Sequence, residues 1–570
     1  MKTLTKLLAL LLVLTMTVGV LAGCGGQTPE VPGNEDPAIE QTENQAPSQS
    51  DNAVEYTGEP LYGGELNVRI SSRPTGIDPM KQTGAFRILF TSCVYDTPLT
   101  RDAQNNIAPG VCDFELSEDQ LVLKMWVRDG FVFSNGDAVD IYDVEASINR
   151  TLKLFSEITK YVKPNVDSVA VANDGEKDVL TVTFKQFSEK NLYYFAAYQT
   201  FFPVMPVEIC QKYASSYLID QVDDAIGSGP YKYTYFEDSV RVTVTKREDY
   251  VPVDNGDATG FASTKYGYMD VIHFWYNATD ASTALGLLNG DYDVAEVLVT
   301  EYKDLAAEKG IVLTTLPSDQ RTWITFNTVN AESPCAKYPS LRKAILAALD
   351  YDTYLDVVQD GAQIFEGENA QFLLGSKYAT DAFTSQDYYG AYDQDVVDKY
   401  LAEAEAEGYK GEPVEVTYHS GRDDIPTLLC DALAEAGIAY ELVTKEPTVY
   451  SAYTGDPSNS WDLYFNWATT SYTPGTLQDS IMQNNYKSDV KDQLLAEMAQ
   501  YSPESEEYKA KWQELAQYTA DGAYVGFLAA IDWWWWHPQT LHINESGDGL
   551  ARYFFNAYWE DPQNHPIKTQ

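Results

Sequence analysis

Apolar and polar positions alternate along three short stretches in the first quarter of the chain. Residues 65–70 alternate in the manner of a half-buried strand, and the Ile-Asp-Pro sequence at 77–79 forms a turn after it. Residues 121–127 and 131–133 alternate again on either side of 128–130, an Arg-Asp-Gly sequence. This second pattern predicts a β-hairpin.

The spacing changes to that of a helix directly after this region. Apolar residues recur at Val144, Ile148 and Leu152, close to the period of about 3.6 residues that an α-helix has. Asp140 precedes the pattern and Asp143 lies in its first turn, where carboxylates accept hydrogen bonds from free backbone N–H groups. We predict a helix that begins after Asp140.

A strand, a helix and a second strand follow one another in the last third of the chain. Residues 414–418 alternate, 428–436 carry an apolar stripe that ends at Gly437, and 438–442 alternate again. This is the pattern of a βαβ unit, whose strands are parallel and pack under the helix. Residues 461–467 then predict a strongly apolar strand.

The start of the chain has a different kind of apolar segment. Lys2 and Lys6 precede a nearly unbroken apolar run at 7–20, and small residues lead to Cys24. This order is typical of a secretory signal peptide. Residues 7–23 fall short of the roughly 20 residues that a helix needs to cross a bilayer, so a permanent transmembrane helix is the weaker interpretation.

The Leu-Ala-Gly-Cys sequence that ends at Cys24 resembles the signal of bacterial lipoproteins. The resemblance implies that residues 1–23 are removed and that Cys24 carries acyl chains. More than one acyl chain is required for stable anchoring, because a single chain binds a membrane only marginally. The alternative is an ordinary signal peptide with an incidental cysteine.

Residues 25–60 are rich in Gly, Pro, Gln, Asn, Ser and Glu and contain no Lys or Arg. Such a segment cannot bury enough apolar surface to offset its ordering entropy, so we expect a disordered tether. Its reach as a flexible coil is roughly 30 Å. The rest of the chain is long enough for three or four units of about 150 residues each.

The chain is strongly acidic, with 85 Asp and Glu against 39 Lys and Arg and a formal charge of -46. This charge repels phosphate groups, which excludes nucleic acid as a partner. Beyond Cys24 there are five cysteines, widely spaced and without a Cys-x-x-Cys or Cys/His cluster. At most two disulfides are expected, and no structural zinc site.

A long segment at 129–139 reads Asp-Gly-Phe-Val-Phe-Ser-Asn-Gly-Asp-Ala-Val and continues to Ser147-Ile148-Asn149-Arg150. Five further segments accompany it in order: 63–66, 227–231 (Gly-Ser-Gly-Pro-Tyr), 285–295, 323–328 and 341–350. Together these segments resemble the large solute-binding components of ABC importers, specifically the oligopeptide and dipeptide group called family 5. The resemblance extends from Leu61 to about Phe554.

This resemblance implies an α/β fold with two lobes, the periplasmic-binding-protein-like fold of class II type, with an extra inserted domain in the first lobe. The expected division is a signal peptide at 1–23, a lipidated Cys24 with its tether at 24–60, a first lobe from 61–92, 206–315 and 520–570, an inserted domain at 93–205, and a second lobe at 316–519.

The same resemblance implies a receptor that captures peptides between its lobes and delivers them to the transmembrane subunits of an ABC permease. We expect a monomer without cofactor or metal, anchored by lipid on the outer face of the cell membrane. An oligosaccharide or another small solute is the alternative ligand. An extracellular hydrolase is the runner-up class, because abundant carboxylates leave a glycosidase-like pair open.

The ligand segment of this family contains a tryptophan and, three residues later, an aspartate that holds the ammonium group of a bound peptide. Here the tryptophan is Trp467, followed by Ala468 and Thr469, and Thr470 stands where the aspartate belongs. A hydroxyl offers one neutral hydrogen bond in place of a charge-assisted bond about twice as strong. We therefore predict that the ligand's amine is not anchored in the way the family pattern implies.

Other candidate ligand residues come from loops and aromatic positions. Ser72 and Arg73 match the loop after the first strand, and Arg73 could pair with a carboxylate of the ligand. Trp323, Tyr418 and Trp534 are candidate walls of the site. For each aromatic residue except Trp467, core packing is an equally good interpretation. At most about half of the run 533–536 can face a ligand, because side chains alternate along a strand.

No catalytic or nucleotide-binding motif occurs that would favour an enzyme. The sequence has no Walker A loop, no G-x-S-x-G and no H-E-x-x-H. His537 and His542 are separated by Pro538, so they cannot share a helix face as a metal pair would.

Overall fold

The computed structural model of the chain describes residues 58–70, 74, 76–80, 86–103, 106–196, 201–215, 218–276, 280–295, 302–351, 353–354, 378–389, 392–419, 424–469, 474–476, 486–503, 505–543 and 553–563. All of them belong to one compact unit, Tyr56–Gln570. The expected signal peptide, Cys24 and most of the tether lie outside the described residues. Within the described residues, no helix combines the length and the apolar character that crossing a membrane requires.

The first lobe is built on a four-stranded sheet in the order β1-β10-β9-β8. Its strands are β1 (Glu65–Ile70), β8 (Tyr231–Glu237), β9 (Arg241–Lys246) and β10 (Val271–Tyr276). The predicted strand at 65–70 is confirmed, but it is buried on both faces rather than one. On the face expected to meet water, Asn67 and Arg69 are buried, and the carboxylate of Asp293 accepts from the backbone and side-chain N–H groups of Asn67.

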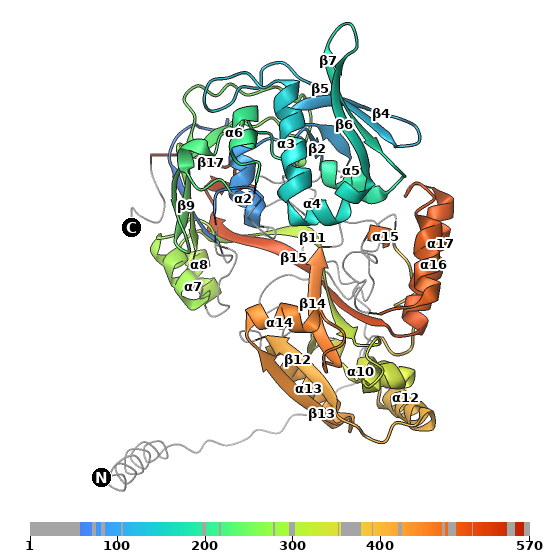
Figure 1. The fold of residues 1–570 in the computed structure, drawn as a ribbon. Coiled ribbons are helices and arrows are strands. Elements are labelled where there is room, and N and C mark those ends of the chain that lie inside the picture. The colour runs from blue at the N-terminus through green and yellow to red at the C-terminus, as the bar shows by residue number, and fades with distance from the viewer. Residues whose placement is uncertain are drawn as a thin grey trace, which may run out of the picture. The chain divides into compact units, whose positions relative to one another are not determined.

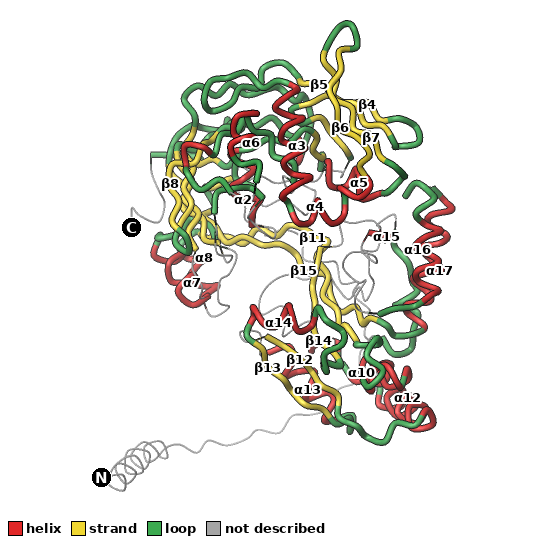
Figure 2. Tube along the Cα trace, viewed as in Figure 1, coloured by secondary structure: helices red, strands yellow, loops and turns green. Residues whose placement is uncertain are grey.

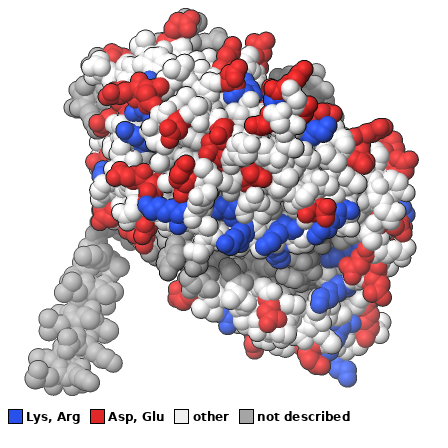
Figure 3. All heavy atoms as spheres, turned by 45° about the horizontal axis from the view of Figure 1, so that its top comes forward, with Lys and Arg blue, Asp and Glu red and all other residues white. Residues whose placement is uncertain are grey.

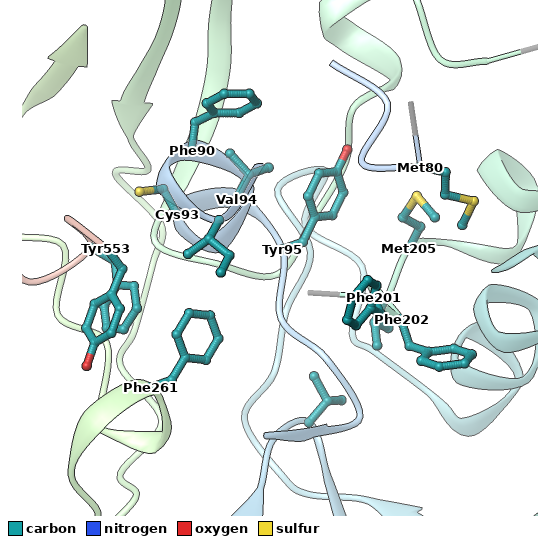
Figure 4. Packing of buried hydrophobic residues seen from close by; sticks show 14 of the residues in the cluster. Met80, Phe90, Cys93, Val94, Tyr95, Phe201, Phe202, Met205, Phe261 and Tyr553 are labelled. Carbon is teal, nitrogen blue, oxygen red and sulfur yellow. The ribbon is translucent and has the colours of Figure 1, made fainter. Parts of the chain in front are cut away.

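Helix α2 (Phe86–Val94) packs against this sheet and against the C-terminal part of the chain. Figure 4 shows Phe90 and Cys93 of α2 in one buried cluster with Phe261 and Tyr553. The turn at 227–231 lies directly against the end of α2. A Cβ at Gly227 would come within 2.1 Å of the carbonyl oxygen of Val94, so only glycine fits there.

An antiparallel sheet follows, in the order β4-β5-β7-β6. Its strands are β4 (Cys112–Leu116), β5 (Val122–Val127), β6 (Val166–Asn173) and β7 (Asp178–Phe184). The hairpin predicted between 121–127 and 131–133 is wrong, because β5 pairs with β4 and β7. Residues 131–133 instead fold back on 137–139, and Arg247 binds the carbonyl oxygens of Val132 and Phe133. A short pair, β2 (Leu99–Arg101) and β3 (Ile107–Pro109), completes this region.

The predicted helix after Asp140 is confirmed as α3 (Ile141–Leu154). Asp140 accepts from the N–H groups of Tyr142 and Asp143, and the Asp143 carboxylate accepts from the N–H of Asp140. This reciprocal capping satisfies backbone donors that the first turn leaves free. The helices that follow are α4 (Ser156–Tyr161), α5 (Glu189–Phe195) and α6 (Val207–Lys212).

The second lobe contains a five-stranded sheet in the order β13-β12-β14-β11-β15. Its strands are β11 (Ile311–Phe326), β12 (Val414–His419), β13 (Tyr440–Lys445), β14 (Leu463–Thr469) and β15 (Val525–Pro538). The predicted βαβ unit is confirmed: β12 and β13 are parallel, and α13 (Asp424–Glu435) lies between them in sequence. The predicted apolar strand at 461–467 corresponds to β14.

Two strands connect the lobes. β11 and β15 pair over nearly their full lengths, with an irregularity between Leu316 and Gln320. At one end they belong to the five-stranded sheet, and at the other end Ala295 bridges to Trp536 while Val68 bridges to Val294. Figures 1 and 2 show this long strand pair running between the two sheets.

The remaining helices surround these sheets. They are α7 (Asp280–Asn289), α8 (Lys303–Glu308), α9 (Pro334–Lys337), α10 (Pro339–Ala348), α12 (Gln394–Glu407), α14 (Pro447–Thr454), α15 (Pro474–Thr476), α16 (Asp489–Met498) and α17 (Glu506–Asp521). A C-terminal ribbon of β16 (Leu541–His542) and β17 (Tyr558–Trp559) packs in the same core as β1.

The five cysteines after Cys24 are all described, and each is buried without a disulfide. The expectation of up to two disulfides thus has no counterpart in the structure. The expected residue boundaries of the two lobes and the inserted domain stay predictions.

Candidate functional site

The parallel strands of the second lobe bring several predicted ligand residues to one edge of its sheet. β12 runs parallel to both β13 and β14, so Tyr418 near the end of β12 and Thr469 at the end of β14 lie toward the same edge. In α/β sheets, ligands bind outside the carboxyl ends of the strands. This edge, which we call the carboxyl edge, is therefore the candidate site.

Backbone register places the predicted ligand segment beside β11. Trp467 is opposite Thr322, Ala468 is opposite Arg321, and Thr469 is opposite Gln320. β14 ends there, whereas β11 continues toward Ile311. Over that continuation, no strand among the described residues pairs with β11 on the side of β14. An open strand edge offers N–H and C=O groups to an extended chain.

Tyr418 is half-buried in β12 and lies opposite Thr444 of β13. Its neighbour Thr417 is fully buried, and Thr417 Oγ1 donates to a carboxylate oxygen of Glu415 at 2.9 Å. Tyr418 shares a face of β12 with Val414 and Val416, which are buried in the core of the second lobe, but its own side chain stays partly accessible near the carboxyl edge. This arrangement is compatible with its predicted role as a wall of the site.

Trp323 has the contacts of a core residue. Its side chain is fully buried, its ring centroid lies 6.1 Å from that of Phe527, and its indole N–H donates to Thr325 Oγ1 at 3.0 Å. Trp323 therefore fills the core, which is the second of the two interpretations that the sequence allowed for this residue. The structure thus brings the strand of Trp323 next to β14 without exposing the indole.

The tryptophan run at 533–536 forms part of β15. Trp535 is buried in the core of the first lobe, where its ring meets that of Phe554 at 5.3 Å, and Trp536 is buried in a separate cluster with α7. Trp534 is opposite Thr315 of β11. Its side chain, like those of Trp467, Ala468 and Thr469, lies outside the described residues, as do Ser72, Arg73 and Thr470 entirely.

Asp462, the described carboxylate nearest in sequence to the ligand segment, lies at the other end of β14. Its two oxygens accept from Ser333 Oγ at 2.5 Å and from the N–H of Glu415 at 2.7 Å. Burial raises the pKa of this carboxyl, and those two hydrogen bonds oppose the rise. Since both oxygens hold the second lobe together, Asp462 is not placed to bind an amine at the carboxyl edge.

Sequence reasoning missed two buried ion pairs of the first lobe. Arg150 on α3 meets Asp78 at 2.5 Å, with side-chain exposures of 1% and 0%. Lys265 meets Asp96 at 2.7 Å, with 10% exposure for each side chain. Both Asp78 and Arg150 lie in segments that the sequence singled out, but nothing in the local pattern links positions 72 residues apart.

A small polar cavity lies beside the second of these pairs. It has a volume of about 30 Å³, and its lining includes Asp96, Lys265, Thr100 and Ser263. The hydroxyls of Thr100 and Ser263 are buried there without a protein partner. Such a volume holds a water molecule or two, so this cavity is too small to receive a peptide.

Residues 106–489 match the family model of bacterial extracellular solute-binding proteins, family 5. The chain belongs to this family. The match covers more than half of the chain and includes α3, β11, β12 and β14. Membership confirms the resemblance inferred from the sequence and the two-lobed α/β fold that it implied.

A curated relative within this group is the oligopeptide-binding protein OppA of Bacillus subtilis. It is 25% identical over 321 residues, which make up 52% of this chain and 55% of the relative. The alignment thus spans about half the length of this curated relative.

Solved structures with the same fold bind different solutes. The periplasmic EDTA-binding protein EppA has a TM-score of 0.71 and 18% identity, with 88% of this chain and 98% of that chain covered. DppA from Helicobacter pylori, an ABC transporter-associated periplasmic binding protein in complex with the peptide STSA, has a TM-score of 0.67 and 18% identity, with coverage of 88% and 99%. At these identities the likeness shows the fold alone.

Proposed function

We propose that this protein is the solute receptor of an ABC importer and that it binds peptides at the carboxyl edge of the second lobe. The observation that carries the proposal is the register of β14 against β11, which puts the backbone of Trp467, Ala468 and Thr469 next to an open stretch of strand edge. A peptide in extended conformation can hydrogen-bond to such an edge through its main chain, whatever its side chains are.

The remaining predicted ligand residues complete this proposal. We propose Tyr418, Trp467 and Trp534 as aromatic walls, and Ser72 and Arg73, which follow β1 in the sequence, as polar ligand contacts. Thr470 replaces the expected acidic partner of the ammonium group, so main-chain contacts carry more of the affinity. A free amine on the peptide is then of minor importance.

A different small solute is the second candidate ligand. It is favoured by the EDTA-binding structure, which has the same fold and nearly the same coverage as the peptide-bound one. An oligosaccharide could also use aromatic walls. In each case the protein binds and releases its solute unchanged, as expected of a binding-protein family rather than of an enzyme.

Thermal unfolding in the presence of candidate solutes tests this function directly. The full chain carrying Cys24→Ser is screened against peptide and oligosaccharide libraries. A solute at 100 times its dissociation constant stabilises the folded protein by about 2.7 kcal/mol, so peptides should raise the unfolding temperature. If only neutral oligosaccharides do so, the peptide assignment is wrong. Turnover of a stabilising solute would instead favour the hydrolase class.

The anchor is tested separately. We propose that acyl chains on Cys24 hold the receptor at the outer face of the cell membrane, near the transmembrane subunits of its permease. Cys24→Ser should then move the protein from the membrane fraction to the soluble fraction, as measured by fractionation and immunoblotting. Retention of the variant in the membrane fraction would contradict the lipid anchor.

A further inference from the structure

Four exposed lysines follow one another along the corner between α3 and β7 in the first lobe. Lys153 lies in the last turn of α3, Lys160 lies in α4, Lys163 begins the short 3-10 helix Lys163–Asn165, and Lys185 directly follows β7. We call these four residues the lysine row.

Side-chain contacts fix the positions of three of the four lysines. Lys185 Nζ donates to the carbonyl oxygen of Pro164 at 2.9 Å, which puts it beside Lys163. Lys160 Nζ lies 4.7 Å from the ring centroid of Tyr161. At the other end, Lys153 Nζ donates to the carbonyl oxygen of Ala214 at 2.5 Å. The partners are thus backbone carbonyls or a ring.

Among the described side chains, no carboxylate lies within ion-pair distance of any of the four ammonium groups; the side chains of Glu157 and Glu189, which are near the row in sequence, lie outside this description. Lys212 on the adjacent α6 is different, because it pairs with Asp224 at 2.6 Å. Apart from the buried and paired Arg150, residues 150–165 contain three basic residues and one acidic residue, in a chain whose net charge is -46. Such a local excess is unusual for this protein.

The row also lies on the side of the first lobe that is turned toward the connecting strands. In Figure 1, α4 and the end of α3 lie at the edge of the first lobe nearest β11 and β15. Figure 3 shows several Lys and Arg side chains in a band across the middle of one face, whereas Asp and Glu are more frequent on the upper part of that face.

We propose that the lysine row recruits acidic peptides, so that the preferred solute carries carboxylate side chains. This inference rests on the proposed function and names the substrate class of that receptor. Each exposed pair contributes little alone, about 0.2 to 1 kcal/mol, but several cations along one edge raise the local concentration of an anionic ligand and its association rate.

A small solute fits the row better than an anionic membrane does. A bilayer meets the whole body, including its many exposed carboxylates, whereas a peptide near the row is screened from distant acids beyond about 8 Å at physiological salt. The charges that oppose a membrane therefore act only weakly on a short peptide.

The test compares two matched peptides, Ala-Glu-Ala-Glu-Ala and Ala-Gln-Ala-Gln-Ala, by calorimetric titration of the full chain carrying Cys24→Ser at low and high salt. We expect the Glu peptide to bind about tenfold tighter at low salt, as a few exposed pairs allow, and the difference to shrink at high salt. The row variant replaces all four lysines by Gln and should bind both peptides equally.

Two further variants separate a local effect from net charge and from folding. The charge control also loses four exposed lysines, but on other elements, and should keep the full preference: Lys124→Gln, Lys177→Gln, Lys232→Gln and Lys410→Gln. Replacing the row by four arginines should restore the preference for the Glu peptide, which a merely structural role of the lysines would not predict.

Each outcome decides between the two proposals. Equal binding of the two peptides to the parent, or an unchanged preference in the row variant, overturns the role of the row while peptide binding stands. Equal loss of preference in the charge control also overturns it, because net charge then explains the effect. Binding of neither peptide, together with no response to any peptide in the thermal screen, overturns the peptide function and the inference with it.

Discussion

Two buried carboxylates, Asp78 in the first lobe and Asp462 in the second, are held differently. In the first lobe, Asp78 faces the guanidinium of Arg150 and accepts from the N–H groups of Met80 and Ile219. In the second lobe, Asp462 has only neutral donors, Ser333 and the N–H of Glu415. Asp78 thus depends on a cation, whereas Asp462 depends on neutral donors, so the two carboxylates should respond differently to mutation and to pH.

The largest expected effect comes from breaking the ion pair of the first lobe. Arg150→Met leaves the charge of Asp78 buried without a cation and should cost about 3–5 kcal/mol of stability. The measurement is the shift of the denaturant midpoint of the full chain. Lys153→Met on the same helix is the exposed control and should change the midpoint little. The double variant Asp78→Leu, Arg150→Met should recover part of the loss, and a loss no larger than that of the control would contradict the account.

His537 on β15 is a buried base with neutral partners, and it should make stability rise with pH. Burial lowers the pKa of His537 from 6.5 to about 4. Between these values the unfolded chain binds more protons than the folded chain, so the free energy of unfolding increases with pH, by roughly 3 kcal/mol over the window. His537→Gln should flatten that rise, as measured by unfolding at several pH values. An unchanged slope in the variant would assign the pH dependence to other groups.

The smallest expected effect is at Asp462, and it has the opposite sign. Burial raises the pKa of this carboxyl above its ordinary value. At pH values between the ordinary pKa and the raised pKa, the folded chain therefore binds more protons than the unfolded chain. Its contribution to stability therefore falls with increasing pH. Asp462→Asn should remove this fall and change stability at neutral pH by about 1 kcal/mol, the value of one hydrogen bond. A loss as large as that of Arg150→Met would show that the two carboxylates do not differ in this way.

Local patterns predicted the elements but not every partner. Helix α3 could be predicted because helix signals depend on residues a few positions apart. These signals are the spacing of Val144, Ile148 and Leu152 and the capping carboxylates. The alternation at 131–133 predicts a strand that pairs with 121–127, but β5 pairs instead with β4, which precedes it, and with β7, which follows residues 131–133 by more than 40 residues. Strand pairing depends on distant residues that alternation does not specify.

The same holds for the candidate site: some of its features follow from the local sequence, and others depend on contacts between distant residues. The family resemblance predicts a ligand role for residues 467–470. The register of β14 with β11 defines which residues lie opposite 467–469 in the sheet. The core position of Trp323 could not be inferred from the sequence. An apolar side chain in a strand gives the same alternation whether it faces a ligand or packs in the core. The Asp78–Arg150 pair joins two segments that no spacing rule connects.

The measurement that tests the central claim most directly is the effect of N-acetylation on peptide binding. A peptide found by thermal screening is titrated, with a free and with an acetylated amine, into the full chain carrying Cys24→Ser. With Thr470 in place of an acidic residue, acetylation should change the dissociation constant by less than about threefold, and Trp467→Ala should weaken both forms alike. Loss of a buried charge pair costs 2–5 kcal/mol, or roughly thirtyfold to several thousandfold in affinity, and a loss of that size on acetylation would contradict the account.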